Sequence, residues 1–140
     1  MSPEQWRPPR VKVVLYQNGK IRLMHSVNDT RWRFPEGATV IKDGTPERTA
    51  ERLMKEQFQL HIVVRGILGV TFDDVGDHLG QAMTYVFAVS YSEVTDPLPG
   101  LQLNAHNLKR IEAMNEKEVA GDVMEMVHKA QAHEAEEKPR

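Results

Sequence analysis

Alternating apolar and polar residues predict a β-hairpin near the start of the chain. In residues 10–26, apolar side chains recur at every second position on both sides of Asn18-Gly19, and a period of two is typical of strands. Asn-Gly readily adopts the positive φ angles of a tight hairpin turn. We therefore expect two antiparallel strands joined at Asn18-Gly19.

Shorter extended pieces are expected after the hairpin. Residues 28–32 are expected to turn, and residues 32–34 to form a short strand that Pro35 ends, because proline lacks the N–H that a strand needs. Residues 37–41 are a further extended piece, and Asp43-Gly44 is a second turn.

The pattern then changes to a helical period. Thr45 can cap a helix that has Pro46 in its first position and Glu47 near its positive end. Apolar residues four positions apart give this helix one apolar face, made of Ala50, Met54 and Phe58. We expect the helix to end near Gln59.

Strands and loops dominate the next part of the chain. Residues 61–74 are rich in β-forming residues, with a bend expected at Gly66, and residues 73–80 read as a polar loop. Residues 81–92 read as a strand, and residues 108–114 as a further one. In the strand at 81–92, alternation places one set of side chains on one face, namely Met83, Tyr85, Phe87 and Val89.

A capping box begins the last expected helix. Asn115 and Glu118 have the spacing at which a cap residue and a glutamate satisfy each other's backbone N–H groups. The helix should run to Ala130, with an inward face made of Val119, Val123 and either Met126 or Val127. Because helices and strands do not alternate regularly, the fold class is predicted as α+β with a mixed β-sheet.

Composition narrows the classes of function. A chain of 140 residues fits one domain, which we place at 10–131, between a flexible arm at 1–9 and a charged tail at 132–140. The absence of cysteine excludes disulfides, thiolate metal sites and a cysteine nucleophile. A net charge of −2 gives no electrostatic case for DNA binding. No apolar run approaches the ~20 residues of a membrane span. No signal peptide is evident either, so we expect a cytoplasmic or organelle-matrix protein.

The stretch FPEGATVIKDGTPERTAERLMKEQFQL, residues 34–60, resembles the signature of the Nudix (MutT-like) hydrolase superfamily. The resemblance covers residues 10–131. It includes the opening hairpin, a W-x-F-P-x-G entry at 32–37, the start of the helix at 44–53, and a later strand followed by a C-terminal helix. It implies a Nudix-type α/β/α sandwich with a mixed sheet.

The Nudix pattern is Gly-x5-Glu-x7-Arg-Glu-U-x-Glu-Glu-x-Gly-U, where U is a bulky apolar residue. Active members hold Mg²⁺ on the helix carboxylates and hydrolyse a diphosphate linked to another group. Divalent ions neutralise the charge that accumulates on the diphosphate and position the attacking water. Carboxylates at i, i+3 and i+4 of one helix can share these ions.

This chain keeps only part of that pattern. Arg52 and Glu56 match the arginine and the first glutamate of the Glu-Glu pair. Leu53 and Gln57 stand where the other helix glutamates fall, and Gly44 stands where the early glutamate falls. The resemblance is therefore to a degenerate Nudix box. It retains Arg52 and Glu56 as catalytic remnants, and we expect Mg²⁺ or Mn²⁺ to bind weakly or not at all.

Other acids could complete a metal site. Glu36 lies in the loop before the helix, and Asp43 partly stands in for the missing early glutamate if Gly37 is the leading glycine of the box. With Glu56, these are the candidate metal ligands. Asp73, Asp74 and Asp77 are either recruited acids or ordinary solvated ones. The alternative interpretation of Arg52 and Glu56 is a surface ion pair at i and i+4.

Aromatic and basic residues are the candidate ligand contacts. Nudix family members bind substrate beside the strands that correspond to Trp32, Arg33 and Tyr85, and aromatic side chains can stack on bases. Arg22 adds to a basic N-terminal region suited to phosphate. The alternative interpretation places the aromatic residues in the core.

Two functional hypotheses follow from the resemblance. The first is a Nudix-fold protein with a largely lost metal site. It would bind a nucleotide or phosphorylated ligand, or act as an assembly subunit, with little or no hydrolysis. The second is a divergent Mg²⁺-dependent hydrolase of nucleoside diphosphate derivatives that uses recruited acids. A homodimer fits either hypothesis.

Overall fold

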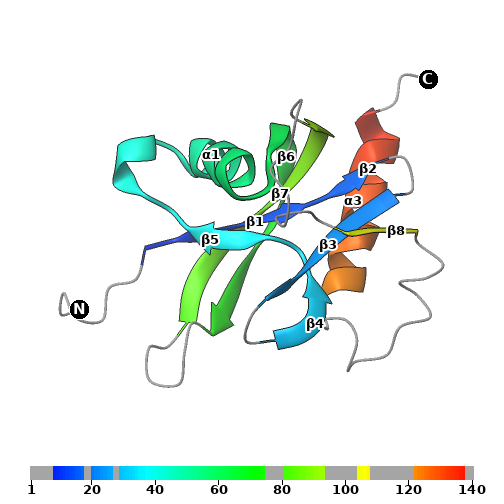
Figure 1. The fold of residues 1–140 in the computed structure, drawn as a ribbon, viewed down its shortest axis with the longest axis horizontal. Coiled ribbons are helices and arrows are strands. Elements are labelled where there is room, and N and C mark those ends of the chain that lie inside the picture. The colour runs from blue at the N-terminus through cyan, green and yellow to red at the C-terminus, as the bar shows by residue number, and fades with distance from the viewer. Residues whose placement is uncertain are drawn as a thin grey trace.

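The computed structural model describes residues 8–17, 20–26, 29–74, 81–93, 104–107 and 122–137. Its elements in chain order are the strands and helices β1 (Arg10–Val14), β2 (Tyr16–Gln17), β3 (Lys20–Ser26), β4 (Asp29–Arg33), β5 (Glu36–Ala38), the 3₁₀ helix η2 (Ile41–Asp43), α1 (Pro46–Phe58), β6 (Leu60–Asp74), β7 (Gln81–Glu93), β8 (Asn104–Asn107) and α3 (Val123–Glu137). Figure 1 shows their arrangement.

The strands form two groups. The larger sheet has the order β5-β1-β7-β6, in which β1 runs parallel to β7 and the other neighbouring pairs are antiparallel. The smaller group has the order β2-β3-β4, with β8 paired to β3. The architecture is therefore α+β with a mixed sheet, as the element order predicted.

Helices α1 and α3 cover opposite faces of the larger sheet. Gly37 of β5 packs against α1, and Gly66 of β6 packs against α3. Strand register places Gly37 in one row with Tyr85, and Gly66 in one row with Ala88. Tyr85 and Ala88 are an odd number of positions apart in β7, so they point to opposite faces. The sheet is the middle layer of an α/β/α sandwich.

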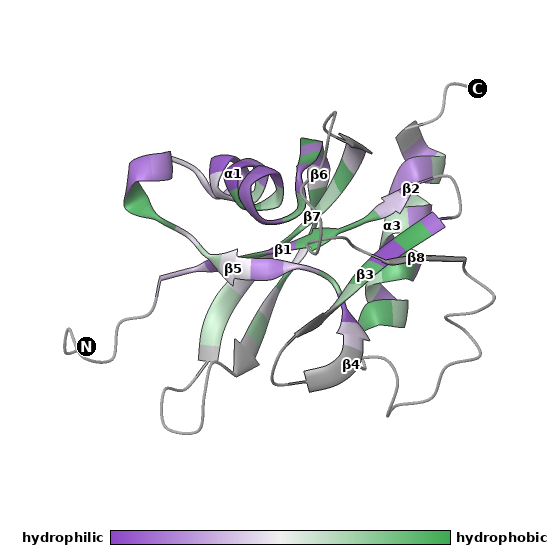
Figure 2. Cartoon of the chain, viewed as in Figure 1, coloured by the Kyte–Doolittle hydropathy of each residue, from purple (hydrophilic) through white to green (hydrophobic). Residues whose placement is uncertain are grey.

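Strand β1 shows how the core is filled from both sides. Val11, Val13 and Val14 have no exposed surface, which means that neighbours cover both faces of the strand. In Figure 2 this strand is largely hydrophobic, in contrast to the mainly hydrophilic α1. Lys12 is the buried charged residue of β1, and it forms an ion pair with Asp122 before α3.

The expected hairpin at 10–26 forms only in part. β2 and β3 pair antiparallel, with Tyr16 opposite Ile21. β1 separates from β2 at Leu15 and joins the larger sheet instead. The physical reason is that β1 is apolar on both faces and both of its edges find partners, β5 and β7. The turn at 18–19 lies outside the described residues.

Two short segments also differ from expectation. Most of the turn expected at 28–32 is strand β4, because pairing with β3 brings Ser26 opposite Asp29. The extended piece expected at 37–41 is β5 followed by η2, which ends at Gly44 with a φ of +88°. In both cases tertiary pairing and turn geometry override the local pattern.

Helix α1 confirms the local signals in the sequence. Thr45 Oγ1 accepts a hydrogen bond from the Arg48 N–H at 3.2 Å, and Pro46 occupies the first position. Gln59 closes the helix in the left-handed conformation with a φ of 52°, where glycine is the usual residue. The helix begins and ends where the sequence predicted.

The C-terminal helix extends beyond the expected one. α3 runs to Glu137, so the tail expected at 132–140 is helical as far as that residue. Alanines at 130, 132 and 135 favour this extension, since alanine has the highest helix propensity. The expected strand at 108–114 and the capping box at 115–118 lie outside the described residues, whereas β8 had no signal in its polar sequence. In the described ranges, neither helix has the length and apolar character needed to cross a membrane.

Residue 9, the last residue of the expected arm, is bonded to the chain after β5. The Pro9 carbonyl accepts hydrogen bonds from the Thr39 N–H and the Thr39 hydroxyl, both at 2.8 Å. The strand connection after β5 therefore holds the chain just before β1.

Candidate functional site

An open groove runs along the outer side of α1, with a volume of about 850 Å³. This volume falls within the range of small-molecule sites, about 300–1,000 Å³. Its walls come from η2, α1 and the start of β6. The lining residues are mostly charged: Lys42, Asp43, Arg48, Glu51, Arg52, Lys55, Glu56, His61 and Ile62.

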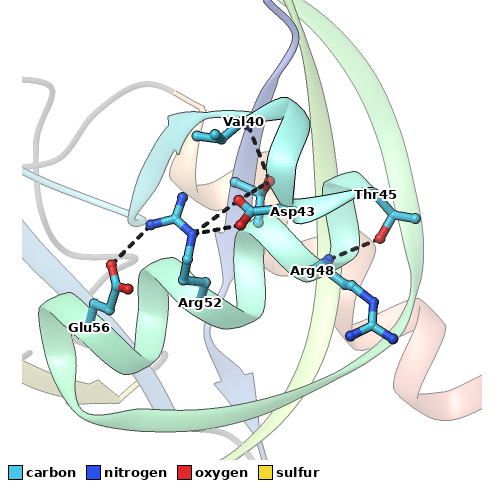
Figure 3. A network of polar contacts seen from close by, with 7 residues as sticks. Val40, Asp43, Thr45, Arg48, Arg52 and Glu56 are labelled. Atoms are coloured by element: carbon cyan, nitrogen blue, oxygen red, sulfur yellow. Dashed lines mark hydrogen bonds and ion pairs between the residues drawn. The ribbon is translucent and has the colours of Figure 1, made fainter.

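Arg52 is the centre of a polar network in this groove. Its Nε donates to both carboxylate oxygens of Asp43, at 2.9 and 3.0 Å, and its Nη1 donates to Glu56 Oε2 at 3.0 Å (Figure 3). Thr49 Oγ1 donates to Asp43 Oδ2 at 2.9 Å. Both carboxylates next to Arg52 are therefore engaged with its guanidinium.

The network changes the acidity of its members. Burial alone raises the pKa of Asp43, but hydrogen bonds from Thr49 and Arg52 and the charges of Arg52 and Lys42 outweigh it. The net result is a pKa below the usual 3.8. The hydrogen bond to Asp43 is the main cause of a raised pKa of Arg52. The Asp43–Arg52 pair is thus fully charged at neutral pH.

Leu53 occupies the position of the first helix glutamate of the Nudix pattern. Only 7% of Leu53 is exposed, and a Cβ atom placed on Gly37 would collide with Leu53 Cδ1. The side chain therefore packs between the helix and β5. Position 53 therefore offers no oxygen atom to a metal ion.

The other acids near α1 do not form a metal-binding cluster among the described residues. Glu56 is 61% exposed at its side chain and is paired with Arg52, and Gln57 is exposed and uncharged. Among the described residues, no three His, Cys, Asp or Glu side chains gather closely enough to hold a metal ion. The described donor set does not fit the divalent site of the Nudix pattern. Asp73 and Asp74 end β6, but their side chains, like the whole of Asp77, lie outside the described part.

Glu36 belongs to a second polar cluster, away from the groove lining. Its carboxylate lies 3.8 Å from Lys12 Nζ and 3.9 Å from Arg33 Nη1. Lys12 Nζ also donates to Asp122 Oδ2. This cluster connects β1, β4 and β5 to the start of α3, so Glu36 and Arg33 have structural partners here.

The other candidate ligand residues also lie outside the lining of the groove. The Arg22 guanidinium sits 5.4 Å from the centre of the Tyr91 ring, a cation–π contact. Trp32 packs against the core. Tyr85 stacks on Phe87 with ring centres 6.3 Å apart.

Sequence reasoning identified Arg52 but missed the other basic residues of the groove. Arg48, Arg52 and Lys55 share the outer side of α1, and Lys42 joins them from η2. The signal available in the sequence was their spacing, because positions 48, 52 and 55 lie one turn apart on a helix.

Comparisons with known proteins show the fold. No protein-family model and no curated protein sequence matches the chain. A NUDIX hydrolase from Nitrosomonas europaea has a similar structure, with a TM-score of 0.73 at 14% identity over 91% of this chain and 90% of that one. A NUDIX-family hydrolase from Clostridium perfringens has a TM-score of 0.72 at 13% identity over 94% and 99%. The NUDIX domain of Shewanella oneidensis NrtR, complexed with ADP ribose, has a TM-score of 0.63 at 16% identity over 94% and 92%.

Proposed function

We propose that this chain, which has the Nudix fold, binds a phosphorylated ligand of the nucleotide class beside α1 without using metal ions on that helix to hydrolyse it. The observation that carries the proposal is the burial of Leu53 against Gly37. A buried leucine at this position removes one ligand of the metal site. The ion pair with Arg52 removes much of the free charge of Glu56.

The groove offers basic side chains in place of divalent metal ions. Within the described part of the chain, Lys42, Arg48 and Lys55 form no ion pair, although all three line the groove. Arg52 is held in a fixed orientation by Asp43. Ammonium and guanidinium groups bind phosphate oxygens through charge-assisted hydrogen bonds. The ligand class is supported by the fold, since a structurally similar NUDIX domain is complexed with ADP ribose.

Calorimetric titration with ADP-ribose, with and without EDTA, tests the proposal. We expect binding that EDTA leaves unchanged and that weakens with salt, because exposed charge contacts are screened. A phosphate-release panel of nucleoside triphosphates, nucleotide sugars and dinucleotides should show no turnover with Mg²⁺ or Mn²⁺. Turnover that falls about a hundredfold in Glu56→Gln would establish a working hydrolase instead.

Substitutions in the groove provide the matched controls. Lys42→Gln, Arg48→Gln and Lys55→Gln combined should weaken ADP-ribose binding by about tenfold or more, since each removes a charged hydrogen-bond donor. Lys129→Gln removes the same kind of charge from α3, where Lys129 pairs with Glu125, and should change nothing. Equal affinity of both variants would place the ligand elsewhere.

A restoration variant tests the missing carboxylates. Leu53→Glu with Gln57→Glu rebuilds the charge pattern of the Nudix helix, and we expect it to bind Mn²⁺ more tightly than the wild type. Electron paramagnetic resonance of free Mn²⁺ measures this gain. If Mn²⁺ affinity does not rise in a variant that circular dichroism and urea unfolding show to be folded, the assignment of α1 as the Nudix helix is contradicted.

A further inference from the structure

Strand β6 exposes an unusual amount of apolar surface. Val63 is 57% exposed, Ile67 52%, Val70 44% and Phe72 64%. Scattered apolar residues on a surface need no explanation, but a contiguous patch marks an interaction site. Ile67, Val70 and Phe72 share one face of the strand and form a patch, which we call the β6 patch, whereas Val63 lies opposite Ser90 on the other face.

Strand register shows why this patch is exposed. Ile67, Val70 and Phe72 pair with Phe87, Tyr85 and Met83 of β7, and antiparallel partners project from the same face. This is the face that α1 covers nearer the centre of the sheet, where Phe87 is only 3% exposed. The apolar face of the sheet therefore extends beyond the part that α1 covers, onto the outer strand β6.

Among the described residues, the backbone of β6 is also open on one side. β6 is the last strand in the order β5-β1-β7-β6, and in the described residues it pairs only with β7. Natural proteins protect such edges with proline, lysine or other charges. From residue 62 to residue 72, β6 contains no proline and one charged residue, Arg65. An unprotected edge and an apolar patch thus coincide.

We propose that the β6 patch is covered by a second copy of this chain, with the two β6 strands paired antiparallel about a twofold axis. The charge sequence of the strand favours this occupant. His61 and Arg65 lie in its first half, whereas Asp73 and Asp74 end it. Antiparallel pairing places the first half of one copy beside the second half of the other, so basic positions meet acidic ones.

This arrangement satisfies both features of β6. The twofold axis makes the contact self-complementary, as closed dimers require. The two four-stranded sheets join into one continuous sheet, and the patches meet across the axis on the same face. The inference does not depend on the proposed ligand, because the patch residues are not in the lining of the groove.

Sedimentation velocity of the full chain over a range of concentrations tests the proposal. We expect a dimer in the wild type. Ile67→Lys with Phe72→Lys should raise the dimer dissociation constant by about a hundredfold, because both side chains lose apolar contact in each copy. Ile41→Lys is the matched control, since Ile41 is 92% exposed on η2, and it should leave the dimer intact. A monomeric wild type, or a dimer that survives the double substitution, would overturn the proposal.

Cysteine cross-linking gives a second readout that does not depend on charge substitutions. The chain contains no cysteine, so single substitutions at positions 67 to 72 report on β6 without background. Antiparallel pairing about a twofold axis predicts a single maximum of disulfide dimer along the strand, with yields that fall on both sides of it. Uniformly low yields at all positions would contradict the pairing of β6, even if the protein is dimeric.

Discussion

Arg52 and Asp43 form a two-pronged contact in which one guanidinium nitrogen reaches both carboxylate oxygens, at 2.9 and 3.0 Å. The contact joins η2 to the middle of α1. Asp43 is only 9% exposed at its side chain, so the carboxylate is held inside the network. The ion pair therefore holds η2 against α1, and this contact depends on the ionised form of Asp43.

The lowered pKa of Asp43 makes stability depend on pH. The folded chain binds this proton less readily than the unfolded chain, so Asp43 contributes stability above the usual value of 3.8 and loses it as the pH falls through the lowered folded value. We expect the free energy of unfolding in urea to decrease below about pH 4. The decrease should be smaller in Asp43→Asn. Glu51→Gln, an exposed acid of the same groove, should retain the wild-type profile.

The cap at Thr45 should contribute measurably to stability. Thr45→Ala removes the oxygen that accepts the Arg48 N–H and should cost about 1 kcal/mol. Thr45→Ser keeps that oxygen and should cost little. Urea unfolding at neutral pH measures both variants. Equal losses in both variants would mean that the cap hydrogen bond is not the source of the effect.

The contact between Gly37 and Leu53 predicts non-additive substitutions. Gly37→Ala forces a Cβ atom into Leu53 and should cost about 1–3 kcal/mol by overpacking. Leu53→Ala leaves a cavity and should cost about 2–5 kcal/mol. In the double variant the new methyl group enters the vacated space, so the combined loss should be smaller than the sum. A strictly additive pair would show that the two side chains do not share that space.

Lys12 should hold α3 against the sheet. Its ammonium group contacts Glu36 and Asp122, and Lys12→Met leaves these carboxylates without their shared donor. We expect a loss of about 1–3 kcal/mol and faster amide hydrogen exchange in α3. Lys129→Met, at the exposed pair with Glu125, should have almost no effect. Unchanged exchange in α3 would contradict this role of Lys12.

Local signals and long-range pairing explain how far the sequence could predict this fold. The start of α1 is set by the neighbouring residues Thr45 and Pro46. Because this signal is local in the sequence, the helix was predicted correctly. The split between β1 and β2 at Leu15 depends on the pairing of β1 with β7, more than sixty residues further along the chain, and no local pattern contains that information. The helical extension to Glu137 was hidden because charged residues suggested a tail.

The same distinction between sequence signals and tertiary contacts applies to the candidate site. The departure of Leu53 and Gln57 from the Nudix pattern was readable from the sequence, because a family pattern gives the expected residue at each position. The contact of Asp43 with Arg52 required the geometry of η2. The assignment of Glu36 to the cluster around Lys12 required the pairing of β1 with β5.

The burial of Leu53 also constrains how this chain can evolve. A carboxylate at position 53 would have to replace a side chain that is only 7% exposed. Burying a charge without partners is strongly unfavourable. Under the proposed function, a mutational path that introduces a metal ligand at position 53 passes through variants that have lost packing before they have gained a metal ion. Such a barrier separates the two sequence states, and natural drift is expected to keep the protein on its present side.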